Sequence, residues 1–174
     1  MTHSVQLIAQ YREFARFVEQ LKSLSEAEWS MPVTAGKVSV REIVGHLLNW
    51  DQHLGTQVIP AAREGLGLYF PEFDAFNEIG YAYARTVQQE VLIDQFIYHR
   101  HWLCEQLQRM PTMQLLKPTT ANGAYLCPRS GKPYSLLYII EEMIDHDQYH
   151  QRYLQQALSP LSSSVYPIHS HLSI

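Results

Sequence analysis

The sequence is poor in cysteine, in charge and in long apolar runs, and each shortage excludes a class of protein. Two cysteines, Cys104 and Cys127, occur in 174 residues. They form neither a CxxC pair nor a disulfide framework, which favours a reducing, cytoplasmic setting. No apolar run approaches the roughly 20 residues that a transmembrane helix needs, and the polar, amphipathic N-terminal segment is unlike a secretory signal. We therefore expect no membrane association.

The charge balance excludes a further class. Charged residues make up 17% of the chain, the net charge is -4, and basic residues form no cluster, which argues against a nucleic-acid-binding surface. The hydrophobic content of 46% is that of a globular protein. The length is that of one domain with a substantial core. What the chain has in unusual number is histidine (9) and tyrosine (11).

Apolar residues recur at helical spacing in four long stretches. Ser39 and Glu42 form a capping box that predicts the start of the second helix near Val40. Asp74 is predicted to cap the third, and Pro111 to end it. Because no stretch reads convincingly as a strand, we expect an all-α four-helix bundle. The predicted helices cover residues 3–24, 40–65, about 75–110 with a bend or break near 85–87, and 135–158.

Two segments fall outside these helices. Residues 111–133 form a long connection before the last helix, and a loop of that length is usually functional or packed over something. Long connections also allow a crossover topology instead of a simple up-and-down bundle. Residues 159–174 are rich in serine and proline and are expected to form an irregular C-terminal tail. The bundle is therefore assigned to residues 1–158.

The last predicted helix carries two histidines on its inward face. His146 and His150 are four residues apart and lie in a stripe whose members recur every three or four positions. A buried imidazole needs a partner, and two side by side suit a metal ion that a third group helps to hold. The alternative is a pair of core histidines bonded to tyrosine or carboxylate. The stripe consists of Leu136, Ile139, Met143, His146, His150, Tyr153 and Ala157.

The second predicted helix offers the third ligand. His46 and His53 share one face but lie two turns apart, so they cannot hold one ion together. His46 is flanked by apolar residues and by Gly45, which allows close helix approach, so we prefer it over His53. Imidazole suits Zn, Ni, Cu and Fe. Three protein ligands with an open position are the arrangement of a catalytic zinc.

Four further residues are candidates for roles near this site. Asp147 occupies the position of the glutamate in HExxH zinc sites. It is assigned as a candidate catalytic base, with orientation of an imidazole or a plain surface charge as alternatives. Trp50 and Asn77 are assigned to the substrate pocket, although core packing and helix capping are their simpler roles. Arg100, between His99 and His101, is predicted to lie on a solvated face rather than to bind an anion.

Three motifs, in this order and at these spacings, resemble the DinB-like superfamily of small bacterial metal-binding bundles. Its relatives include thiol-dependent maleylpyruvate isomerases and bacillithiol transferases. The likeness covers residues 1 to about 158. The motifs are S-x-x-E-x-x-x-H-L-x-x-W at residues 39–50, D-x-x-N at residues 74–77 and H-x-x-x-H at residues 146–150.

The resemblance implies an up-down-down-up bundle, often a homodimer, with Zn or Ni held by His46, His146 and His150. It also implies thiol chemistry, with a low-molecular-weight thiol as a candidate cofactor. We therefore expect a metal-dependent enzyme that acts on a small molecule by thiol S-transfer or hydrolysis. The alternative is a metal-stabilised scaffold without turnover, its ion closed off by a fourth protein ligand such as Asp51, His53 or a tail histidine.

Overall fold

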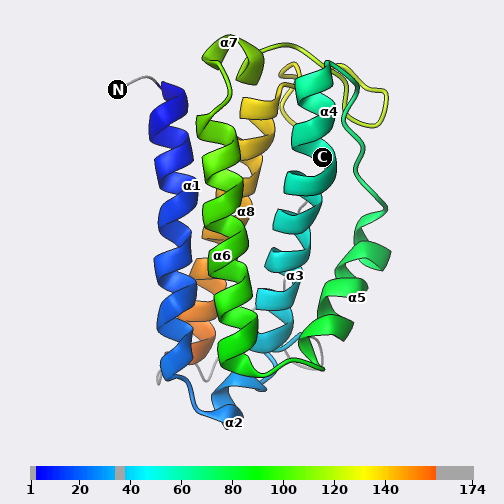
Figure 1. The fold of residues 1–174 in the computed structure, drawn as a ribbon. Coiled ribbons are helices and arrows are strands. Elements are labelled where there is room, and N and C mark those ends of the chain that lie inside the picture. Colours follow the sequence, from blue (N-terminus) through cyan, green and yellow to red (C-terminus); the bar gives the residue numbers. More distant parts are fainter. Residues whose placement is uncertain (1–2, 34–37, 160–174) are drawn as a thin grey trace.

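The protein is a bundle of long helices, shown in Figure 1. The structure is a computed structural model, and it describes residues 3–33 and 38–159. The predicted tail beyond residue 159 lies outside the described residues. The long helices are α1 (His3–Gln20), α3 (Val40–His53), α6 (Gln89–Gln108) and α8 (Leu136–Leu158), and the other elements are η1 (Leu21–Ser23), α2 (Glu26–Trp29), η2 (Leu54–Val58), α4 (Ile59–Glu64), α5 (Phe73–Ala84) and α7 (Thr112–Leu115).

The four long helices have the up-down-down-up order. Helices α1 and α8 run in one direction along the bundle axis and α3 and α6 in the other (Figure 1). Helix α6 packs on both α1 and α3, and α1 also packs on α8, whereas α3 and α8 approach each other closely at few positions. The predicted all-α fold, this topology and the long connection before α8 are confirmed. None of the helices described is both long and apolar enough to span a bilayer.

Local signals in the sequence place most helix ends. The Ser39 hydroxyl accepts a hydrogen bond from the Glu42 amide, and the Glu42 carboxylate accepts one from the Ser39 amide at 2.6 Å. This capping box was predicted, and α3 begins at Val40 as expected. Helix α8 likewise begins after Ser135, whose hydroxyl accepts from the Tyr138 amide. The predicted break between α5 and α6 is present at residues 85–88.

The start of α5 differs from its prediction. The N-cap is Glu72 rather than Asp74, because the Glu72 carboxylate accepts hydrogen bonds from the amides of Asp74 and Ala75. Aspartate is the preferred N-cap by statistics, but the longer Glu72 side chain satisfies the free amides of Asp74 and Ala75, so the helix starts two residues earlier than predicted. Asp74 is instead a first-turn residue, where its charge complements the helix dipole.

The connection before α8 packs over the end of the bundle, one of the two outcomes expected for it. The backbone of Leu68 pairs with Thr120, and the Asn122 side chain bonds both backbone groups of Phe70. Cys127 lies in this loop and is buried; Cys104 is buried inside α6, and neither forms a disulfide. The loop therefore closes the apolar core at this end.

The buried apolar residues form two clusters, one toward each end of the bundle. The first surrounds Trp50 and Tyr138, and the second surrounds Trp29 and Phe96. Between them, at mid-height, lies a layer of buried polar side chains. Five of them are at most 6% exposed: His46, Asp51, Arg100, His146 and Asp147. This polar layer contains the site described below.

Helices α3 and α5 touch backbone to backbone beside this layer. A Cβ atom added at Gly80 would lie 2.8 Å from the Gly45 carbonyl oxygen and 2.9 Å from the His46 Cα. One added at Gly45 would lie 2.5 Å from the Gly80 carbonyl oxygen. The close approach foreseen for Gly45 is therefore real, and its partner is Gly80. It places α5 directly against His46.

Gly80→Ala is expected to destabilise the protein by about 1–3 kcal/mol, because the new methyl group meets backbone that cannot move aside. Helix propensity alone predicts the opposite sign, a gain of up to about 1 kcal/mol. Urea unfolding measures the difference. Ala82→Ser, on the exposed face of α5, is the control and should change stability by no more than about 0.5 kcal/mol. A more stable Gly80→Ala protein would contradict the close approach.

Candidate metal centre

Three histidine rings from two helices converge in the polar layer. His46 comes from α3, and His146 and His150 come from α8. The His146 Nε2 lies 3.0 Å from the His46 Nε2 and 2.9 Å from the His150 Nε2. One ligand atom from each ring lies within 4.8 Å of the others. The structure therefore brings together the three histidines that were singled out from the sequence: the i,i+4 pair on α8, and His46 rather than His53 on α3.

Burial keeps these rings neutral. It lowers the pKa of His46 to about 4, and the Asn77 side chain beside the ring partly opposes this shift. Burial likewise lowers the pKa of His146 and of His150 well below the usual value, with a further contribution from the neighbouring rings. Neutral imidazole is the form that binds a metal ion.

Hydrogen bonds between the rings cannot satisfy all three Nε2 atoms. A ring nitrogen offers either one proton or one lone pair, so the His146 Nε2 can pair with only one of its two neighbours. An ion would accept all three lone pairs at once. A tetrahedral ion with Zn–N distances of about 2.0–2.1 Å needs nitrogens about 3.3 Å apart, within a few tenths of an ångström of the observed spacing. The three rings fit a metal ion of the zinc class.

The other ring nitrogens are compatible with this assignment. The Nδ1 atoms of His46, His146 and His150 are buried and have no hydrogen-bond partner within the described part of the chain. Each can therefore carry the ring proton, which leaves the Nε2 lone pair directed at the shared centre.

The suspected fourth ligands are engaged elsewhere. The His53 Nε2 lies 2.8 Å from the Tyr69 carbonyl oxygen, and Asp51 is bound to Arg100 and Tyr11. In residues 3–33 and 38–159, the group of metal-ligating side chains at this centre has three members. The tail histidines, His169 and His171, lie outside the described residues. Within the described protein, a coordination position is thus left for water or substrate.

Aromatic side chains and one amide surround the centre. The Trp50 Nε1 donates to the Asn77 Oδ1 at 2.9 Å, which fixes the amide beside His46. The Tyr81 ring, on α5, lies 5.9 Å from the His46 ring. Trp50 is almost fully buried. Its role at the centre is therefore indirect, through the hydrogen bond that orients Asn77. The sequence did not single out Tyr81, because one exposed-looking tyrosine on α5 carries no local signal.

Helix α8 contributes a further tyrosine pair next to His150. Tyr149 and Tyr153 stack with ring centroids 6.1 Å apart and planes 5° from parallel, and the Tyr149 ring lies 5.4 Å from the His150 ring. Of the three histidines, His150 is the one that is partly exposed. The centre is therefore most accessible beside this pair.

Asp147 faces away from the histidines, toward Arg100. The Arg100 Nη1 donates to one Asp147 carboxylate oxygen at 2.6 Å and Nη2 approaches the other at 3.4 Å. The Asp147 side chain is 3% exposed. Burial raises the pKa of Asp147 to about 7, while Arg100 acts in the opposite direction. Of the roles considered for Asp147, a plain surface charge is wrong, because the carboxylate is buried and paired.

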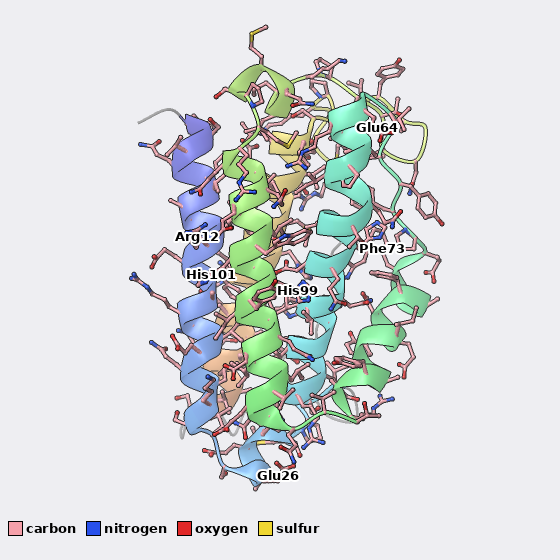
Figure 2. All side chains as sticks on the ribbon, in the orientation of Figure 1. Arg12, Glu26, Glu64, Phe73, His99 and His101 are labelled. Carbon is pink, nitrogen blue, oxygen red and sulfur yellow. The ribbon has the colours of Figure 1, made fainter. Side chains whose placement is uncertain are left out.

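The prediction that Arg100 lies on a solvated face is wrong. Arg100 is fully buried, although His99 and His101 beside it lie on the outer side of α6 (Figure 2). Its Nε and Nη2 donate to the two Asp51 oxygens at 2.7 and 3.1 Å. A buried arginine is expected only where carboxylates pair with it. Asp51 and Asp147 meet that condition through tertiary structure, which the local sequence does not reveal.

A groove of about 340 Å³ runs along the other side of α8, between it and α1. Tyr11, Phe14 and Asp147 are among its lining residues, together with several glutamines from both helices. It therefore approaches the Arg100 layer rather than the histidine centre. We assign the candidate site to the histidines, because the groove does not contain them.

Metal-free protein is expected to lose stability as the pH falls from about 6.5 toward 4. In this range the unfolded chain protonates His46, whose ordinary pKa is about 6.5, but the folded chain keeps it neutral because its pKa is lowered to about 4. Each such proton costs about 1.4 kcal/mol per pH unit. Urea unfolding in chelator at several pH values measures the slope. His46→Gln should reduce the slope of stability against pH by the contribution of one proton, about 1.4 kcal/mol per pH unit. Equal slopes in both proteins would contradict the burial of this ring in neutral form.

Comparisons with known proteins identify a similar fold and the family. The chain is similar in structure to YfiT from Bacillus subtilis, described as a probable metal-dependent hydrolase with an unusual four-helix bundle topology. The TM-score is 0.69 at 13% sequence identity, over 90% of this chain and 87% of that one, which is a likeness of fold. No curated protein sequence matches the chain. The sequence profile of the DinB superfamily matches residues 9–154, a span that contains all three histidines. The chain belongs to the DinB superfamily.

Proposed function

We propose that this protein is a metal-dependent hydrolase of a small molecule, with a divalent ion held by His46, His146 and His150. The observation that carries the proposal is the convergence of three neutral Nε2 atoms, from buried His46 and His146 and partly exposed His150, that hydrogen bonds between the rings cannot all satisfy. The description of YfiT as a probable metal-dependent hydrolase supports the same reaction class. Zinc and nickel are the proposed ions, because both accept imidazole ligands.

The reaction class follows from the ligand set. A zinc-class ion with three protein ligands lowers the pKa of a bound water toward about 7 and polarises a carbonyl or phosphoryl oxygen. The chain itself supplies a water-poor setting and a fixed amide. Asn77, held by Trp50, lies beside His46 and can donate a hydrogen bond to a bound substrate. The Tyr81 and Tyr149 rings offer apolar faces to a small molecule.

A base role for Asp147 stays a prediction, and its surroundings weigh against it. Both carboxylate oxygens approach Arg100, and the side chain is almost fully buried. A general base must reach the proton that it removes. We therefore propose that Asp147 supports the centre through Arg100 rather than by proton transfer.

Other expectations from the sequence also remain proposals. The same centre would bind a low-molecular-weight thiol as readily as water, so thiol S-transfer stays open as a reaction. A homodimer and a cytoplasmic location likewise remain predictions. A metal-stabilised scaffold differs from the enzyme in one respect: its ion has a fourth protein ligand.

His46→Ala and His146→Ala are each expected to abolish stoichiometric metal, because two imidazoles hold an ion far less firmly than three. Elemental analysis of protein purified without a tag measures the ion. His53→Ala is the matched control, since His53 lies on the same helix and bonds the Tyr69 carbonyl group instead. Full metal content in both ligand variants would refute the site.

Hydrolysis is expected to depend on the same residues. Metal-loaded protein should cleave members of a panel of small esters, amides and phosphoesters, and the activity should vanish with chelator and in His146→Ala while persisting in His53→Ala. If the fully loaded protein cleaves nothing in the panel and X-ray absorption shows four protein ligands, the scaffold reading replaces the hydrolase.

A further inference from the structure

We propose that Arg100 is a positioning residue for the metal centre, whose guanidinium group holds α3 and α8 at the separation that the three histidines need. The inference rests on the proposed function, because it concerns the same centre. Among the described residues, Arg100 makes hydrogen bonds to carboxylate and carbonyl groups rather than to the imidazoles. It acts through the two helices that carry them.

The guanidinium group binds both ligand-bearing helices at once. On α3 it donates to the two oxygens of Asp51, at 2.7 and 3.1 Å. On α8 it donates to Asp147 at 2.6 Å. Asp51 follows His46 by five residues, and Asp147 directly follows His146. Each end of this bridge is thus within about 8 Å along the helix axis of a metal ligand, at a rise of about 1.5 Å per residue.

The bridge matters because little except apolar packing otherwise joins α3 to α8; Trp50 and Met143, for example, belong to one apolar cluster. They approach each other closely at few positions, whereas α6 packs along both α1 and α3. Besides the imidazole contacts, Arg100 provides a polar link between α3 and α8. Arg100 reaches the two helices from α6, while α5 covers His46 on another side. Arg100 therefore adds, from α6, a charged bridge to the apolar packing that α3 and α8 share.

The surroundings keep the guanidinium group rigid. Its central carbon lies 3.8 Å from the Tyr11 ring centroid and 4.8 Å from that of Phe96. Nη1 also donates to the Tyr11 carbonyl oxygen at 2.9 Å, and the Tyr11 hydroxyl donates to Asp51 at 2.8 Å. The side chain is fully buried. A planar fork with this many partners fixes two carboxylates in a way that a lysine ammonium group cannot.

The expected effect has the size seen when an outer partner of a metal ligand is removed. Such changes typically weaken metal binding by about 10–100-fold while the ligands themselves remain. Because α3 and α8 would then be free to shift, the coordination geometry should change along with the affinity. A purely stabilising role for Arg100 predicts neither change in protein that is fully folded.

The test compares cobalt binding in four full-length proteins: wild type, Arg100→Lys, the triple variant Arg100→Met with Asp51→Asn and Asp147→Asn, and Leu92→Ala. Cobalt(II) reports affinity by titration and geometry by its visible absorption. Arg100→Lys keeps the charge but loses the fork. The triple variant leaves no unpaired buried charge, so it remains measurable where Arg100→Lys fails to fold. Leu92, fully buried in α6, is the control for general destabilisation.

Three results decide the matter. If the folded Arg100 variants bind cobalt about 10–100-fold more weakly with an altered spectrum, and Leu92→Ala binds like wild type, the positioning role stands. If the folded Arg100 variants match wild type in affinity and spectrum, or if Leu92→Ala weakens binding equally, the positioning role is overturned and the metal centre remains. If wild type itself binds no cobalt, zinc or nickel, the proposed function fails, and the positioning role fails with it.

Discussion

The cost of burying charge at mid-height is the constraint on which this bundle depends. A guanidinium group that is fully shielded from water is tolerable only if carboxylates and carbonyl groups replace its hydration. Asp51, Asp147 and the Tyr11 carbonyl group do so, and in turn they fix where α1, α3 and α8 lie around Arg100 on α6. The two apolar clusters pack above and below this layer. The polar layer thus joins four helices at one height of the bundle, between the two clusters.

The same layer explains why the histidines sit where they do. Neutral imidazoles can be buried at lower cost than charged groups, and burial lowers the pKa of all three rings. Packing against Gly45 and Gly80 brings α5 over His46, which shields the centre from one side. Because the His146 Nε2 cannot pair with both neighbouring nitrogens at once, the cluster is costly without an ion, so the fold and the centre are energetically linked.

Much of the fold and of the histidine centre could be predicted from local sequence patterns. The features that could not be predicted depend on contacts between distant residues. Helical periodicity and the Ser39 capping box predict the bundle and the start of α3, because both depend on residues within one turn. The spacing of His146 and His150 predicts their shared face for the same reason. Arg100 could not be placed, since its burial depends on Asp51 and Asp147, about 50 residues away in either direction. The predicted N-cap of α5, Asp74, was wrong because the Glu72 carboxylate accepts the hydrogen bonds of the first free amides, a role that aspartate usually has.

Access to the centre follows from what covers it. The close contact between Gly45 and Gly80 leaves no room for a ligand between the two backbones at these glycines, and the loop before α8 closes the core at one end of the bundle. Arg100 and its partners fill the side toward α6. Within the described residues, the remaining side is that of the partly exposed His150, next to the stacked Tyr149 and Tyr153. A small, flat or partly apolar molecule suits such a wall better than an extended polymer, because stacked rings bind planar faces well. The shape of the accessible side therefore favours the proposed substrate class, a small molecule.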